Sequence, residues 1–168
     1  MRPNVSAVVD LDDRFVDICK DGYDFAVRIG RVIGSSAVIA KPLAPSPSLV
    51  CCSPDYANRA GLPQDLESLR DHDGIGYASV PSGDLWEFLT KGINCKPCST
   101  PMRCRLVVNS GEATRDATIA GLGLAVLPHF IAAHALKSGE LIDALPFYKP
   151  TPRHIYAMYP STRHPLSR

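Results

Sequence analysis

The feature that most constrains the fold is the alternation of short apolar strands with helices along the chain. Residues 5–9 (VSAVV) are largely β-branched, which predicts a strand. Residues 12–20 carry apolar side chains spaced three and four apart, which predicts a helix with one apolar face. Residues 23–29 are mostly apolar and predict a second strand, buried on both faces. A strand, a helix and a strand in close succession predict a βαβ unit with a parallel strand pair, and hence an α/β fold.

The second half of the chain repeats this alternation with clearer signals. Residues 103–108 predict a strand, and Asn109-Ser110-Gly111-Glu112 is similar to a capping box at the start of a helix. Residues 124–127 are apolar and predict a buried strand, after which Pro128 begins another helix. The helix between the two strands is expected to bury one face, which carries Ala113, Ala117 and Ala120.

Shorter elements are expected in the rest of the chain. Residues 36–50 contain several prolines among apolar residues and predict an extended segment suited to a crossover between two lobes. Ser53 and Pro54 predict a helix start, with Ser53 as the N-cap, and Gly61 predicts its end. The remaining expected elements are a short helix at 66–69, a loop around residue 95, and strands at 74–77, 86–88, 141–145 and 155–159.

Charge and hydropathy exclude several classes of function. The 168 residues include 18 basic and 17 acidic side chains, for a net charge of +1. A self-sufficient nucleic-acid-binding domain usually has a basic face, so this segment is not expected to bind nucleic acid by itself. No apolar run approaches the length of about 18 residues that spans a bilayer, and the first residues lack the apolar core of a signal peptide. We therefore expect no membrane partner and a cytoplasmic location.

The cysteines predict neither a disulfide framework nor a metal site. In a reducing compartment they are expected to be thiols. Cys95 and Cys98 form a Cys-x-x-Cys pair, but a thioredoxin-like motif caps a helix directly after a strand, and the residues here predict a loop. A structural zinc site needs a second pair at suitable spacing. Incidental loop cysteines are the preferred interpretation, and a thiol redox protein is the enzymatic alternative. The sequence has Cys19, Cys51, Cys52, Cys95, Cys98 and Cys104.

No motif of a known catalytic or cofactor site occurs in the sequence. Gly-x-Ser-x-Gly, the Walker loop and His-Glu-x-x-His are all absent. Gly121-Leu122-Gly123 lacks the rest of a dinucleotide-binding fingerprint. We therefore expect no cofactor, no catalytic residue and no enzymatic activity.

Several short motifs, taken in order, resemble the effector domain of LysR-type transcriptional regulators. Residues 22–30 (GYDFAVRIG) are similar to the signature strand of that family, and residues 52–56 (CSPDY) to the segment that enters its second lobe. Each motif is short, but their order and spacing match over nearly the whole chain. The other matching positions are residues 13–17, 69–72, 109–112, 121–128, 138–141 and 159–160, together with Ile75, Tyr77, Trp86 and Phe88.

The resemblance implies a fold like that of the type-2 periplasmic binding proteins, with two α/β lobes joined by two crossover strands. The first lobe would comprise residues 1–49 and 152–168, and the second would comprise residues 50–151. A full family member begins with a winged helix-turn-helix domain and a linker helix, which this sequence lacks. Because the chain starts at the family's second strand, the first lobe is expected to be incomplete at its N-terminus.

The resemblance also implies a function. A small molecule, either a carboxylate or an aromatic compound, would bind between the lobes and control DNA binding and transcription. DNA would be bound only through the helix-turn-helix domain, and the intact protein would be a homo-oligomer. A stand-alone small-molecule-binding protein from a truncated gene is the alternative.

Asn109, Ser110 and Gly111 are the first candidate effector contacts. Backbone N–H groups at a helix N-terminus attract anions, whereas the alternative is plain capping by Asn109 or Ser110. Arg28, followed by Gly30, ends an apolar strand and could bind a carboxylate in a bidentate fork. For Arg28 an ion pair with a nearby aspartate, Asp24 or Asp10, is the preferred interpretation.

Aromatic residues and a proline–histidine pair complete the candidate set. Tyr77, Trp86 and Phe88 are suited to line a pocket for an aromatic effector, although core packing is their more common role. Pro128 and His129 follow a buried strand, where the resemblance implies that the second lobe faces the cleft. A lone histidine is more often structural than a ligand contact.

Overall fold

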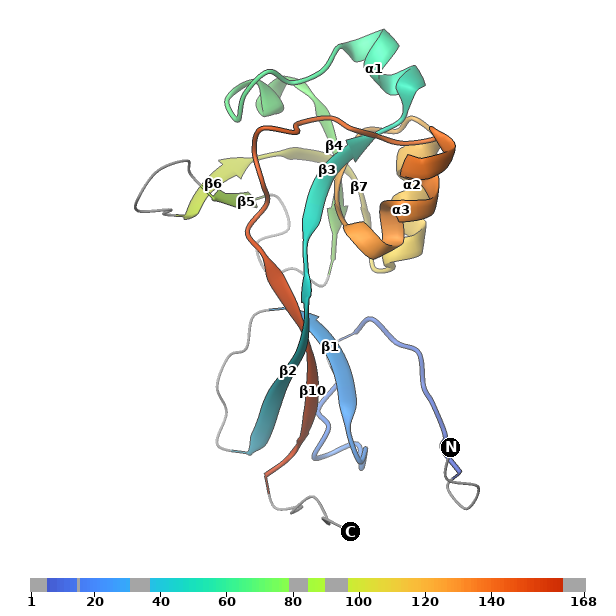
Figure 1. Cartoon of the computed structure of the whole chain (residues 1–168), viewed down its shortest axis with the longest axis vertical. Coiled ribbons are helices and arrows are strands. Elements are labelled where there is room, and N and C mark those ends of the chain that lie inside the picture. The colour runs from blue at the N-terminus through green and yellow to red at the C-terminus, as the bar shows by residue number, and fades with distance from the viewer. Residues whose placement is uncertain (1–5, 15, 31–36, 79–84, 90–96, 162–168) are drawn as a thin grey trace.

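The computed structural model describes residues 6–14, 16–30, 37–78, 85–89 and 97–161. Figure 1 shows two parts, one above the other, which we call the large part and the small part. The large part holds all the helices and most of the strands that the structure describes, and the small part holds one antiparallel sheet. The chain passes from the small part to the large part near residue 47 and returns near residue 151.

The small part is a three-stranded antiparallel sheet. It contains β1 (Ala26–Gly30), β10 (Arg153–Pro160) and β2 (Val38–Ser46), in that order. The predicted parallel βαβ unit is therefore wrong, because β1 pairs with the distant β10 and residues 6–9 are not in a strand. The expected burial of this strand on both faces is also wrong. Val27 is 56% exposed, since the described residues leave that face of the sheet open.

A turn replaces the helix predicted at residues 12–20. Asp17 Oδ1 accepts hydrogen bonds from the backbone N–H groups of Cys19 and Lys20, both at 3.2 Å. Asp12 Oδ1 accepts another from the N–H of Arg14 at 2.8 Å. Such local side-chain bonds offer the backbone an alternative to helical hydrogen bonds. The apolar spacing in this segment was therefore not sufficient to produce a helix.

The large part is built on a five-stranded mixed sheet. Its order is β7 (Arg103–Val108), β4 (Asp73–Tyr77), β8 (Leu124–Pro128), β3 (Ser48–Cys52) and β9 (Ile142–Asp143). The strand β4 is parallel to β7 and β8, whereas β3 is antiparallel to β8 and β9. The predicted strands at 74–77, 103–108 and 124–127 are thus confirmed.

Helices and a hairpin cover this sheet. The helical elements are α1 (Pro54–Ala60), the 3-10 turn η1 (Ser68–Asp71), α2 (Gly111–Ile119) and α3 (His129–Ser138). The hairpin pairs β5 (Leu85–Leu89) with β6 (Pro97–Pro101). The predicted start of α1 is confirmed, because Ser53 Oγ accepts a hydrogen bond from the Tyr56 N–H at 3.2 Å. In the described part of the chain, no helix has the length and apolarity needed to span a membrane.

The alternation of side chains along the strands forms two cores, one on each face of the large sheet. Val50 and Cys52 of β3 pack with Phe88 and Trp86 from the hairpin and with the residues of α1. Cys51, between them in sequence, points the other way and packs with residues of α3. This is the period-two geometry of a strand buried on both faces.

The buried face of α2 matches the predicted one only in part. Ala117 packs against a core, whereas Ala113 and Ala120 are exposed, and Thr114 and Thr118 are buried. Their hydroxyls donate to the backbone carbonyls four residues earlier, at 2.9 Å and 2.7 Å. This satisfies the buried hydroxyls, so a threonine face can pack where an alanine face was expected.

Two further predictions need correction. The strand expected at residues 141–145 shrinks to the two residues of β9, because Asp143 Oδ1 accepts a hydrogen bond from the Leu145 N–H at 3.2 Å and turns the chain. Cys98 lies in β6 opposite Phe88 rather than in a loop.

Candidate functional site

Three parallel strands of the large sheet end at one edge. The strand β4 ends at Tyr77, β7 at Val108 and β8 at Pro128, and the register places Tyr77 beside Val108. The antiparallel β3 begins at the same edge, where Ser48 lies opposite Pro128. Open α/β sheets bind ligands outside the carboxyl ends of their parallel strands. This edge is therefore the natural position for a site.

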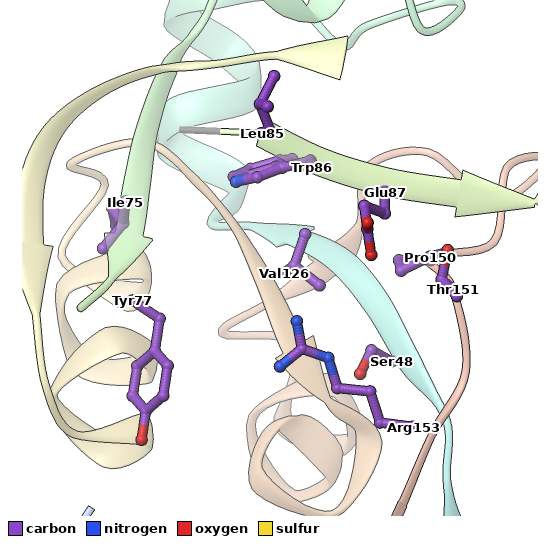
Figure 2. Close-up of a pocket in the computed structure, with 10 residues that line it drawn as sticks. All are labelled: Ser48, Ile75, Tyr77, Leu85, Trp86, Glu87, Val126, Pro150, Thr151 and Arg153. Atoms are coloured by element: carbon purple, nitrogen blue, oxygen red, sulfur yellow. The ribbon is translucent and has the colours of Figure 1, made fainter. Parts of the chain in front are cut away.

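A cavity of about 70 Å³ lies beside this edge, at the junction of the two parts. Trp86 and Val126 contribute apolar surface to its wall. Figure 2 shows the guanidinium of Arg153 and the carboxylate of Glu87 directed toward the same space, with Val126 between them. The polar side chains in the wall are Ser48, Tyr77, Glu87, Thr151 and Arg153. The cavity thus combines opposite charges, hydroxyls and an aromatic surface.

The two segments that join the parts have the same unusual composition. One is Pro45-Ser46-Pro47 and the other is Pro150-Thr151-Pro152. Proline fixes φ and provides no N–H, so these segments are held extended. The N–H of Thr151 donates to the Glu87 carbonyl at 2.8 Å, and the N–H of His129 donates to the Pro47 carbonyl at 2.8 Å. Each crossover is therefore attached to the large part at the side of the cavity.

The hydroxyl at the centre of each crossover is an unused hydrogen-bonding group. Ser46 Oγ and Thr151 Oγ1 are buried and have no hydrogen-bond partner among the described residues. Buried polar atoms are normally satisfied. Thr151 also lines the cavity, so it offers a hydrogen-bonding group at the site.

The Asn109–Gly111 loop lies at the sheet edge and not in the cavity wall. Ser110 is the N-cap of α2, since its Oγ accepts from the Ala113 N–H at 3.3 Å. This settles the choice between Asn109 and Ser110 as the cap. Gly111 permits a close approach of α2 and α3, because an added Cβ would lie 2.5 Å from Ile131 Cδ1. None of the three loop residues is among those that line the cavity.

Arg28 and Gly30 belong to the small sheet. Arg28 Nη1 donates to the Arg14 carbonyl at 2.6 Å, and the side chain is not in the cavity wall. Gly30 lies opposite His154, the neighbour of Arg153, so the end of β1 reaches the junction. The effector roles of both residues, and the ion pair considered for Arg28, stay predictions.

The aromatic candidates divide between the cavity and the core. Tyr77 lines the cavity and is half-buried, and Trp86 lines it while also packing in the core. Phe88 is 0% exposed and belongs to the core alone. Pro128 and His129 are at the start of α3, outside the cavity wall, and His129 is exposed.

Sequence reasoning missed four polar residues of the cavity: Ser48, Glu87, Thr151 and Arg153. A signal for three of them was present. Ser48 and Arg153 directly follow the two Pro-hydroxyl-Pro segments, and Thr151 is the centre of one of them. The occurrence of a Pro-hydroxyl-Pro sequence at both crossovers was the signal that could have identified them. Glu87 had no comparable local signal.

The buried cysteines Cys51 and Cys52 are unsuited to thiol redox chemistry. Burial raises the pKa of Cys51 to about 12 and that of Cys52 to about 11, so both thiols stay protonated at neutral pH. Cys98 is half-buried in β6, and Cys95 lies outside the described residues. Among the residues that the structure describes, no cluster of histidine, cysteine and acidic side chains is arranged to hold a metal ion.

Comparison with known proteins agrees with this architecture. Residues 1–168 match the family model of the LysR substrate binding domain. The chain belongs to the LysR substrate-binding domain family. The resemblance inferred from the ordered motifs is therefore confirmed.

Relatives of this LysR domain are transcriptional regulators. It is 33% identical over 162 residues to an uncharacterized HTH-type transcriptional regulator of Haemophilus influenzae, covering 96% of this chain and 55% of the relative. It is also 33% identical over 181 residues to the uncharacterized HTH-type transcriptional regulator YhjC of Escherichia coli, covering 100% of this chain and 55% of that protein. The chain thus spans about half the length of these curated relatives.

Solved structures show the fold. The regulatory domain of CrgA, a LysR-type transcriptional regulator from Neisseria meningitidis, superimposes with a TM-score of 0.71 at 26% identity, over 85% of this chain and 68% of that one. The effector domain of AmpR from Pseudomonas aeruginosa gives a TM-score of 0.72 at 22% identity, over 99% of this chain and 76% of that one. The predicted two-lobed α/β fold, like that of type-2 periplasmic binding proteins, is confirmed.

Proposed function

We propose that this LysR domain binds a small-molecule effector in the cavity at the junction, and that binding controls DNA binding and transcription by a separate domain. The observation that carries the proposal is the position of Arg153. It is the first residue of β10 in the small sheet, yet its side chain lines a cavity formed mainly by the large part. A ligand held there contacts both parts at once.

We assign residues 1–49 and 152–168 to the first lobe and residues 50–151 to the second. This division is supported by the sheets. The strands β1, β2 and β10 form one sheet, and the large sheet contains β3, β4, β7, β8 and β9. The two crossovers with prolines lie close to the proposed boundaries.

The effector acts in this proposal by shifting a conformational equilibrium. A ligand shifts an equilibrium between an open and a closed form only by its difference in affinity for the two forms. A cavity with walls from both lobes provides that difference, because closure brings Arg153 and Glu87 nearer to a bound molecule. Tyr77 contributes directly to this wall. Asn109, Ser110, Gly111, Pro128 and His129 flank it at the sheet edge, and Arg28 and Gly30 are assigned to the facing lobe.

The relatives support a regulatory context for the whole protein. Both are called HTH-type regulators, so we assign DNA contact to a helix-turn-helix domain and the site of action to the cytoplasm. We propose that the intact regulator is a homo-oligomer, and that the domain acts by binding rather than by catalysis.

Thermal melting against a panel of small carboxylates, aromatic acids and amino acids tests the proposal. A ligand at roughly 100 times its dissociation constant stabilises a protein by about 2.7 kcal/mol, which raises the melting temperature of a domain this size by about 5 to 11 °C. We expect at least one such shift, and we expect Arg153→Met to abolish it. A shift that persists unchanged in Arg153→Met would place the site elsewhere.

A further inference from the structure

The cavity is lined by charges of both signs, and their separation indicates the chemical class of the ligand. Arg153 reaches it from the start of β10, and Glu87 reaches it from β5. In Figure 2 the two charged ends are directed toward the same space, with Val126 between them. A ligand with one anionic and one cationic group complements both charged ends of this wall, whereas a ligand with a single charge complements only one of them.

Each of the two charged residues has a neighbouring residue that carries a hydroxyl group. The backbone N–H of Thr151 donates to the Glu87 carbonyl at 2.8 Å, which holds the two residues side by side in the cavity wall. The Thr151 hydroxyl is buried there and has no hydrogen-bond partner among the described residues. Ser46 lies opposite Arg153 and is 2% exposed, with its hydroxyl likewise unpartnered. Arg153, Tyr77 and Glu87 also have interactions within the chain, so a ligand joins an existing polar network.

The remaining wall and the size of the cavity restrict the ligand further. Trp86 and Val126 form an apolar surface between the polar groups. The volume of about 70 Å³ is well below the roughly 300 Å³ or more of sites for drug-sized ligands. The site therefore suits a compact molecule with two polar ends and a short apolar body.

We propose that the effector is a zwitterion of the α-amino acid type, with its carboxylate bound by Arg153 and its ammonium group bound by Glu87 and Thr151. This inference rests on the proposed function and specifies its ligand. Guanidinium binds a carboxylate in a planar, bidentate geometry. A carboxylate and a hydroxyl together satisfy the donors of an ammonium group.

The test measures binding calorimetrically with matched sets of probes on the whole chain. The protein amino acids are compared with the carboxylic acids and the amines that keep the same side chain, for example valine with 3-methylbutanoate and with 2-methylpropylamine. We expect at least one amino acid to bind about tenfold or more tightly than its carboxylic acid, which is the scale of one charge-assisted hydrogen bond. We expect the corresponding amine to bind weakly.

Variants of the two charged residues test which end of the ligand each of them binds. Glu87→Gln is expected to weaken binding of the amino acid by about tenfold or more and to leave the carboxylic acid nearly unchanged. Arg153→Met is expected to weaken both. Glu140→Gln is a matched control, because Glu140 is an exposed carboxylate beyond α3 that accepts a hydrogen bond from Ser138 Oγ at 2.6 Å. Circular dichroism melts verify that each variant is folded.

Four results would overturn the inference. Equal binding of amino acids and their carboxylic acids, or an amino-acid affinity that Glu87→Gln does not change, would show that the ammonium end is not recognised. Binding by carboxylic or aromatic acids alone would exclude the zwitterion while leaving the proposed function intact. Binding by no member of any set excludes an amino-acid ligand, and the broader melting panel then decides the proposed function separately.

Discussion

The large and small parts of this domain differ in how completely their apolar side chains are buried. Both hydrophobic cores consist of residues of the large part, such as Phe88 in one and Leu127 in the other, each at most 1% exposed. In the small part, Val27 and Ile29 are 56% and 40% exposed on one face of a three-stranded sheet. Stability in a protein is not uniform, and segments with few buried contacts open at lower free energy. We therefore expect the large part to be the more rigid of the two, and the small part to gain more stability from a ligand that contacts it.

Truncation of one apolar side chain in each part gives the largest expected contrast. Phe88→Ala removes a ring that is 0% exposed and should lower the free energy of unfolding by about 3 to 5 kcal/mol. Ile29→Ala, at 40% exposure, should cost about 1 kcal/mol or less. Urea denaturation followed by tryptophan fluorescence and circular dichroism measures both values. Similar losses for the two variants would remove the distinction between the parts.

Two glycines give a second comparison, based on space rather than on burial. A Cβ at Gly123 would lie 2.5 Å from the Asp73 carbonyl oxygen, where β8 passes β4. Gly123→Ala must push the backbones apart, so a loss of about 1 to 3 kcal/mol is expected. Gly30, in the small sheet, has no atom of the described residues within 4 Å of such a Cβ. Gly30→Ala should change stability by about 0.5 kcal/mol or less, and a larger loss there would mean that the end of β1 is more tightly packed.

The pH dependence of stability provides a smaller contrast, between one buried histidine of the large part and one exposed histidine of the small part. His72 is 7% exposed and its Nδ1 lies 3.2 Å from the Tyr56 hydroxyl, and this burial lowers the pKa of His72 below its ordinary value. Because the unfolded chain binds this proton more readily, His72 stabilises the fold fully above about pH 6.5. That contribution is lost as the pH falls through the lower pKa of the folded state.

The variant His72→Gln tests this expectation. Its unfolding free energy should fall less steeply than that of the wild type when the pH is lowered below about 6.5. His154→Gln, in the exposed part of β10, is the matched control for the replacement of a histidine by glutamine. An unchanged slope in His72→Gln would show that another group is responsible for the acid sensitivity.

The sequence was most informative where local signals and packing coincide. In the large part, Ser53 and Ser110 cap helices, and the strands at 103–108 and 124–127 carry their own apolar patterns, so their identity was readable without knowledge of the fold. In the small part, the apolar pattern of residues 12–20 was outweighed by hydrogen bonds that the Asp12 and Asp17 carboxylates accept from nearby backbone N–H groups. Pairing of β1 with β10 joins residues more than 120 positions apart, which no local pattern specifies.

In the candidate site, too, some residues could be identified from the sequence and others only from the fold. Tyr77, one of the three aromatic residues considered from the sequence as lining a pocket, does line the cavity. Glu87 and Arg153 come from distant segments, and the fold alone brings them to one space. Charged residues that are unremarkable in the sequence thus became the main polar groups of the site.

Amide hydrogen exchange, with and without the small molecule that gives the largest melting shift, tests the central claim most directly. A ligand held between Arg153 and Glu87 should slow exchange in β10 and β2 of the small sheet as well as in β5, because the cavity has walls from both parts. The slowing should be larger in the small sheet, where the unliganded protein has fewer buried contacts. Protection confined to the large part, with β10 unchanged, would contradict a site that joins the two lobes.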